Sequence, residues 1–115
     1  MADWILDDVL RVTGVRHAVL ATTDGLVSVK SEGLKTDAAQ RLAAGCAALA
    51  GVATGLARDH ANSTTPPRQV VVELDGALLF VRRGRDTYLA VVADHAVDPA
   101  SLGHALKIVL TAIGN

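Results

Sequence analysis

The sequence predicts an α+β domain: a three-layer α/β/α sandwich around a five-stranded, mainly antiparallel sheet. Three observations predict this fold class. The pairs Asp24-Gly25 and Asp75-Gly76 each separate two apolar runs of strand length, which is the pattern of a β-hairpin. The segment Leu42–Ala57 has no charge and suits a covered helix. Most of the predicted strands are apolar without interruption, so both faces of the sheet need helices.

The first half of the chain predicts a helix, a hairpin and a second helix. Residues 3–13 form the first helix, which Asp3 can begin and Gly14 can end. Its apolar face consists of Ile5, Leu6, Val9 and Leu10. The strands His17–Thr22 and Leu26–Lys30 follow. Thr36 or Asp37 is expected to cap the long second helix, which runs to about Arg58.

The second half predicts three strands and a last helix. A polar, turn-forming stretch from Asp59 to Pro67 is expected to be a mobile surface loop. The predicted strands are Gln69–Leu74, Ala77–Arg82 and Thr87–Ala93. Asp75-Gly76 matches a type I′ turn, and Asp98 with Pro99 is a helix start. The order α-β-β-α-β-β-β-α over residues 1–115 makes one domain, with the second helix on one face and the other two on the opposite face.

Composition narrows the function classes. The chain has 115 residues, 50% hydrophobic and 20% charged, with a net charge of −1. Only Arg82, Arg83 and Arg85 cluster, and the three aromatic residues do not interleave with them, so a nucleic-acid surface is not expected. The single Cys46 excludes an intrachain disulfide and favours a cytoplasmic protein. The acidic N-terminal stretch is unlike a signal peptide.

The second helix predicts an association element. A line of small residues recurs every four positions, and leucines recur every seven positions. The small line is Ala39, Ala43, Ala47, Gly51 and Gly55, and the leucines are Leu42, Leu49 and Leu56. Such a line lets another backbone approach closely. A central helix of a monomer is the alternative, and flanking charges such as Arg41 and Asp59 argue against a membrane span.

The strand with three consecutive valines adds to this prediction. If Gln69–Leu74 lies at a sheet edge, pairing with a second copy would satisfy the edge, and the same two-fold axis could pair the second helices. The alternative is an internal strand of a monomer. The predicted homodimer interface consists of Ala39, Ala43, Cys46, Ala47, Val70, Val71 and Val72.

No catalytic constellation is predicted, so we expect a protein that is not an enzyme and holds no cofactor or metal. The four histidines are far apart and never at ligand spacing: His17, His60, His95 and His104. Cys46 has no nearby base and is expected to be a buried, inert thiol. No glycine-rich phosphate-binding loop occurs.

Several motifs together resemble the roadblock family, which is related to dynein light chains and bacterial GTPase regulators. The resemblance covers nearly the whole chain, and the opening Trp4-Ile5-Leu6-Asp7 resembles the actinobacterial branch. The matching segments are Gly14–Leu20, Thr23–Leu26, Ser31–Leu34, Ala38–Ala43, Gly55–Arg58, Val70–Leu74, Gly76, Leu78–Val81 and Leu89–Val91.

The resemblance implies a roadblock/profilin-like fold and a cytoplasmic homodimer with a continuous sheet across its third strand. It implies a non-catalytic regulator or scaffold of a small Ras-like GTPase, in a signalling system with a sensor-kinase-like protein. Partner contact is expected around the second helix, at Gln40, Arg41 and Arg58. The two arginines are interpreted as solvated helix-end residues, with an arginine finger as the alternative. The other functional alternatives are a small-ligand sensor and a purely structural dimerisation module.

Overall fold

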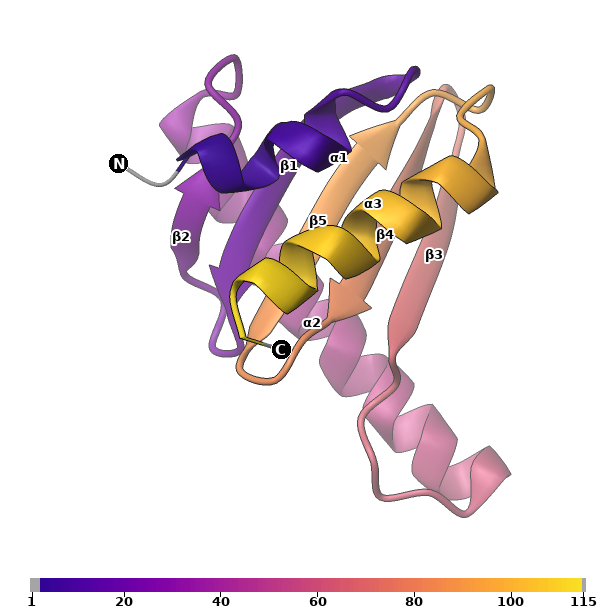
Figure 1. The fold of residues 1–115 in the computed structure, drawn as a ribbon. Coiled ribbons are helices and arrows are strands. Elements are labelled where there is room, and N and C mark those ends of the chain that lie inside the picture. The colour runs from indigo at the N-terminus through magenta and orange to yellow at the C-terminus, as the bar shows by residue number, and fades with distance from the viewer. Residues whose placement is uncertain (1–2, 115) are drawn as a thin grey trace.

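The computed structural model describes residues 3–114 and has the predicted order of elements (Figure 1). A short 3-10 helix and a single α-helical turn open the chain, followed by five strands and two longer helices. The elements are η1 Asp3–Leu6, α1 Asp7–Leu10, β1 Val15–Thr22, β2 Val27–Lys30, α2 Thr36–Ala61, β3 Gln69–Leu74, β4 Ala77–Arg83, β5 Thr87–Ala93 and α3 Pro99–Ala112.

The five strands form one antiparallel sheet in the order β2-β1-β5-β4-β3. The strand β3 therefore lies at an edge, which confirms that part of the prediction. The hairpin β3–β4 is regular, with Val71 opposite Phe80 and Leu74 opposite Ala77. The β1–β2 pairing contains an irregularity between Leu20 and Ala21.

Helices cover both faces of the sheet, as predicted. The helices α1 and α3 lie on one face and α2 runs behind the other (Figure 1). On the first face, Leu89 and Val91 of β5 pack with α3 residues such as Leu106. On the second face, Cys46 and Ala50 of α2 pack with Ala90. Alternate residues of β5 thus contribute to two different cores, which explains its unbroken apolar run.

The helix ends differ from the predictions in three places. The first helix is shorter than residues 3–13: it opens as a 3-10 turn, and its α-helical part ends at Leu10. Neither Thr36 nor Asp37 caps α2, because the N-cap is Lys35, which makes no side-chain cap hydrogen bond. The helix then continues through Ala61, so Asp59 lies in its last turn and not in a loop.

Other local predictions are confirmed or corrected by backbone geometry. Asp98 is the N-cap of α3, and its carboxylate accepts a hydrogen bond from the Ser101 N–H at 3.3 Å. In the β3–β4 turn only Gly76 has a positive φ, of 99°. A type I′ turn needs positive φ at both central residues, so the type I′ prediction for Asp75-Gly76 is wrong.

The helix α2 is longer than the sheet that it covers. Its 26 residues span about 39 Å, and its last turns project beyond the sheet, below β3 in Figure 1. The last buried residue of α2 is Ala50. Asn62, with a φ of 53°, ends the helix and donates its N–H to the Ala57 carbonyl. Within residues 3–114, none of the helices is long and apolar enough to span a membrane.

Candidate functional site

The face of α2 that points to the sheet is occupied by the chain's own core. Ala39 and Ala43 are fully buried against Val19 and Ala21 of β1. Cys46 is fully buried in the core that contains Ala90. Side chains enclosed in this way cannot contact a second copy. The predicted interface residues Ala39, Ala43 and Cys46 thus have no exposed surface in the single chain, and the interface proposed below leaves them out.

The small residues of α2 allow another backbone segment to approach closely, and that segment is the β1–β2 turn of the same chain. The β1–β2 turn lies against this part of the helix at Gly25, which has a φ of 89°. A Cβ on Gly25 would lie 3.4 Å from the Ala44 Cα and 3.4 Å from the Ala47 Cβ. Ala47 is thus partly covered by the turn. A larger side chain there would strain the β1–β2 hairpin.

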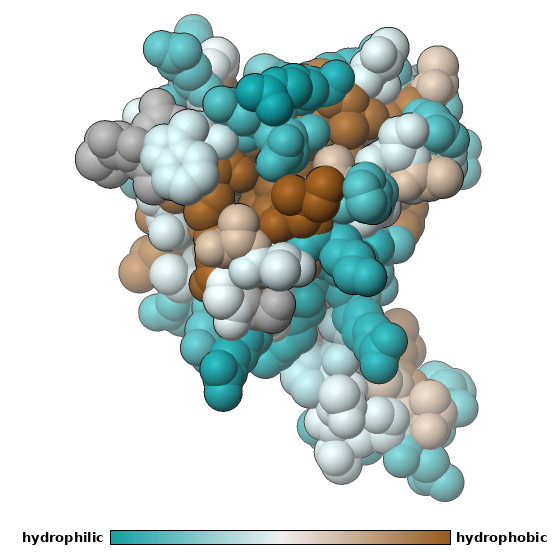
Figure 2. Space-filling model, viewed as in Figure 1, coloured by the Kyte–Doolittle hydropathy of each residue, from teal (hydrophilic) through white to brown (hydrophobic). Residues whose placement is uncertain are grey.

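The second half of the small-residue line remains open. A Cβ on Gly51 or Gly55 would meet no atom within 4 Å. Two larger apolar side chains of the same segment are exposed: Val52 at 64% and Leu56 at 54%. The segment 51–61 thus presents apolar surface on the part of α2 that leaves the sheet, and Figure 2 shows this part standing clear of the body of the molecule.

The leucines of α2 connect this segment to the sheet edge. Leu49 is partly buried and packs with the cluster that includes Val70 of β3. Leu56 follows Leu49 by seven residues, so it lies on nearly the same side of the helix. It is exposed because, within residues 3–114, no strand lies beyond β3. The helix side that carries Leu49 and Leu56 therefore continues past the free edge.

The free edge of β3 carries backbone groups without partners inside the sheet. The Arg83 N–H donates to the Arg68 carbonyl at 2.8 Å, so the backbone of Arg68 faces β4. Hydrogen-bonding direction alternates along an antiparallel strand, so the N–H and C=O of Val71 face outward. The Val71 side chain is also 50% exposed. Val70 and Val72 are partly buried.

The outward face of α2, opposite the sheet, carries small and apolar residues after Arg41. Cys46 and Ala50 mark the side that faces the sheet, and positions 41, 44, 48 and 52 fall on the opposite side of a 3.6-residue helix. These residues are all exposed: Arg41, Ala44, Ala48 and Val52. Sequence reasoning did not single out Ala48 or Val52. Their spacing relative to Cys46 is the signal that could have identified them.

The predicted partner residues lie at the borders of this surface. Gln40 and Arg41 are exposed in the first turns of α2, and Arg58 is exposed in its last turn. Within residues 3–114, neither arginine takes part in an ion pair. Arg58 near the C-terminus of the helix is favourable for the helix dipole. The three residues therefore lie on one helix, but Arg58 is at the opposite end from Gln40 and Arg41.

No catalytic cluster emerges from the histidines and the cysteine. His95 hydrogen-bonds the Leu74 carbonyl at 2.9 Å, while His60 lies in the last turn of α2 and His104 lies on α3. Over residues 3–114, His, Cys, Asp and Glu residues do not form a group that could hold a metal ion. Burial raises the pKa of the Cys46 thiol to about 11, so the thiol stays protonated at neutral pH.

This pKa has a consequence for stability at alkaline pH. An unfolded cysteine titrates near pH 8.5, so above that pH the unfolded chain loses a proton that the folded chain keeps. The stabilising contribution of the protonated Cys46 thiol to the free energy of unfolding is fully present below about pH 8.5. Above that pH it decreases by about 1.4 kcal/mol per pH unit, up to about pH 11.

Urea unfolding between pH 7 and pH 11 tests this expectation. The stability difference between wild type and Cys46→Ala should change with that slope above about pH 8.5, because the alanine variant lacks the titrating thiol. A difference independent of pH would show that Cys46 has an ordinary pKa.

The fold and its exposed helix define a class: a small α/β/α sandwich with an open sheet, whose edge strand β3 lies beside a projecting helix. The Roadblock/LC7 domain model matches residues 1–93 of this sequence. The chain therefore belongs to the Roadblock/LC7 family. Among curated proteins, none matches the sequence significantly.

Solved structures of the same fold support this assignment. A Roadblock/LC7 domain from Streptomyces avermitilis is 36% identical, with a TM-score of 0.89, and the match covers 96% of this chain and 92% of that one. The gliding protein MglB from Thermus thermophilus is 24% identical, with a TM-score of 0.81 and coverage of 96% and 83%. Profilin from Schizosaccharomyces pombe is 13% identical, with a TM-score of 0.67 and coverage of 97% of both chains. At such low identities the last two show the fold alone.

Proposed function

We propose that the chain is a homodimeric, non-catalytic regulator or scaffold that binds a small Ras-like GTPase on its α2 helices. The observation that carries the proposal is the outward face of α2, where Ala44, Ala48 and Val52 are exposed on a member of the Roadblock/LC7 family. Exposed apolar residues grouped on one helix face are typical of a protein-binding surface.

The homodimer rests on the free edge of β3 and on the apolar segment beside it. Two β3 strands pairing antiparallel about a two-fold axis would satisfy the outward N–H and C=O of Val71. The same axis brings the exposed Leu56 toward the partner copy. The revised interface combines Val70, Val71 and Val72 with Leu56, and leaves Val52 on the outward face of α2. Ala47 lies beside it and is shared with the β1–β2 turn.

Dimerisation would create a platform of sufficient size for a GTPase. A standard protein interface buries about 800 Å² on each partner, and two adjacent α2 helices offer a broader outward face than one. Arginines at the border of an interface mainly steer association, whereas buried apolar contacts set the lifetime of the complex. Arg41 and Arg58 are placed for the first task, and Ala48 and Val52 for the second.

The experiment is a titration of the protein with a small Ras-like GTPase from its own genome, loaded with GDP or with a GTP analogue. The double charge reversal Arg41→Glu/Arg58→Glu should weaken binding about tenfold, mainly through slower association, and leave the dimer folded. The control is Arg11→Glu, which reverses one exposed charge, paired with Asp8 at 3.4 Å, on the opposite layer of the domain.

Two results would contradict the placement on α2. One is wild-type affinity in the Arg41→Glu/Arg58→Glu variant, and the other is equal weakening by Arg11→Glu. A dimer that binds no GTPase in either nucleotide state would instead support the structural dimerisation module.

A further inference from the structure

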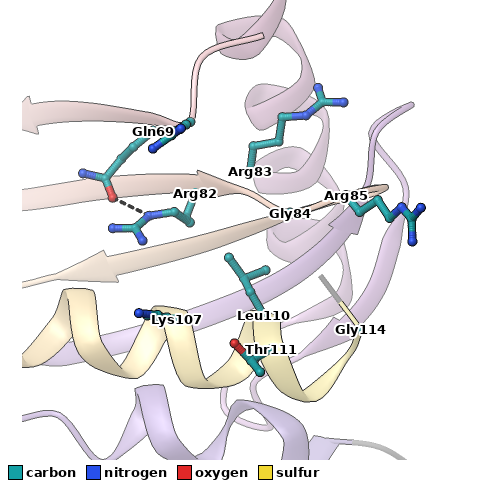
Figure 3. Close-up of a pocket in the computed structure, with 10 residues that line it drawn as sticks. Gln69, Arg82, Arg83, Gly84, Arg85, Lys107, Leu110, Thr111 and Gly114 are labelled. Carbon is teal, nitrogen blue, oxygen red and sulfur yellow. Dashed lines mark hydrogen bonds between the residues drawn. The ribbon is translucent and has the colours of Figure 1, made fainter. Parts of the chain in front are cut away.

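An open hollow lies at one end of the sheet, on the α3 side and away from the outward face of α2. Its volume is about 820 Å³. The start of β3, the β4–β5 turn and the last turns of α3 enclose it (Figure 3). Its lining residues are Arg68, Gln69, Arg82, Arg83, Gly84, Arg85, Lys107, Leu110, Thr111 and Gly114.

The lining of the hollow is rich in basic residues, although the chain as a whole has a slight excess of negative charge. Of the eleven lysines and arginines, five line it, and no aspartate or glutamate among the described residues does. Across residues 3–114, the ion pairs of the structure involve none of these five. Since the net charge of the whole sequence is −1, this local excess is a property of the hollow and not of the surface at large. Such a site attracts anions.

One guanidinium in the wall of the hollow is held in place by a neighbouring side chain. Gln69 and Arg82 are opposite each other on β3 and β4. The Arg82 Nε donates a hydrogen bond to the Gln69 Oε1 at 2.9 Å. A Cβ on Gly103 would lie 4.0 Å from the Arg82 Nη2, so the guanidinium lies beside α3. The bond to Gln69 uses Nε and leaves both terminal nitrogens of Arg82 available to a ligand.

Lys107 of α3 supplies a second cation across the hollow from β4. Figure 3 shows Arg82 and Lys107 on facing elements around the hollow, whereas the side chains of Arg83 and Arg85 point away from it. The Thr111 hydroxyl and the apolar side chain of Leu110 complete the α3 wall. A smaller hollow of about 70 Å³ shares Gln69 and Arg82 and has Phe80 and Leu106 in its lining.

We propose that this hollow is a binding site for a soluble phosphorylated small molecule, with Arg82 and Lys107 as the principal phosphate ligands. A planar guanidinium donates two parallel hydrogen bonds to a phosphate, and a lysine adds a compact charge. Two cations on facing elements, Arg82 and Lys107, favour a ligand with more than one negative charge over a monocarboxylate. The volume falls in the range of about 300–1,000 Å³ typical of small-molecule sites.

Isothermal titration of the full chain with pyrophosphate and with ATP tests the proposal. At least one of them should bind at one site per chain with a dissociation constant below about 1 mM, weakening as salt is raised. Gln69→Glu should weaken binding by about tenfold or more, because a carboxylate of nearly the same shape would pair with Arg82 and repel the phosphate.

The control is Ser28→Glu, which adds the same charge on β2 at the far edge of the sheet and should leave the affinity within about twofold. Lys107→Gln should also weaken binding. Because Lys107 is an exposed residue of α3, this variant tests the site without changing the β3–β4 hairpin. Circular dichroism and gel filtration verify that each variant keeps the wild-type fold and size.

The proposal is overturned if neither soluble probe binds, or if Ser28→Glu weakens binding as much as Gln69→Glu. It is also overturned if the protein binds phosphatidylglycerol vesicles but neither soluble probe, since the phosphate would then belong to a lipid headgroup. None of these outcomes depends on whether a GTPase binds to α2.

Discussion

Val71→Pro is expected to convert the proposed dimer into a monomer at micromolar concentration. Proline removes the outward-facing N–H of Val71 without touching the hydrogen bonds between β3 and β4. The two-fold axis repeats the loss, so two carbonyls of the interface lose a donor, at about 1–3 kcal/mol each. The dissociation constant should rise about 100-fold or more.

Light scattering over a dilution series measures this change. Val71→Thr is the matched control because it keeps the N–H and the β-branched shape, so it should remain dimeric. Proline is tolerated in edge strands, and the far-ultraviolet circular dichroism of the variant should therefore match that of the wild type. An unchanged dimer in Val71→Pro would exclude β3 as the dimer contact.

The strands were predictable because turn chemistry and apolar runs agree at each of their ends. The bounds of Gln69–Leu74 and Thr87–Ala93 match the observed β3 and β5, since Asp75-Gly76 and Arg83–Asp86 delimit them. The end of α2 was less predictable. Asp59 and His60 are polar and suggested a loop, but polar residues are equally suited to a helix that has left the core and is surrounded by water.

The interface residues on α2 could not be assigned from the sequence for a related reason. Small residues lie all around this helix, so the pattern indicates close approach but not which side meets which neighbour. The structure assigns Ala39, Ala43 and Cys46 to the core and Ala47 to the β1–β2 turn. Those contacts depend on where the hairpin and the sheet lie relative to the helix, which periodicity does not specify.

The basic hollow was beyond sequence reasoning because its parts are distant in the chain. Arg82, Arg83 and Arg85 are neighbours in sequence, yet Arg83 and Arg85 point away from the hollow that Arg82 occupies. Alternation along β4 turns successive side chains to opposite faces of the sheet. Strand pairing brings Gln69 to Arg82, and the packing of α3 brings Lys107 to the same hollow. Strand pairing and helix packing are both tertiary contacts, which local sequence patterns do not specify.

The outward face of α2 provides the second large expected effect. Ala48 lies near the middle of that face, between Ala44 and Val52, and its side chain is exposed in the single chain. Ala48→Arg should therefore leave the fold intact, since arginine is a good helix former. In a complex, the long charged side chain would occupy space that the GTPase fills, and its charge would be desolvated. Misfit in a packed contact costs about 1–3 kcal/mol, and burying an unpaired charge adds to it. Binding to the GTPase should thus weaken about 30- to 100-fold, as surface plasmon resonance would show chiefly in faster dissociation.

Ala112→Arg, which changes another exposed alanine in the last turn of α3, is the control and should bind as the wild type does. If Ala48→Arg keeps wild-type affinity while remaining dimeric, the partner does not bind on the outward face of α2.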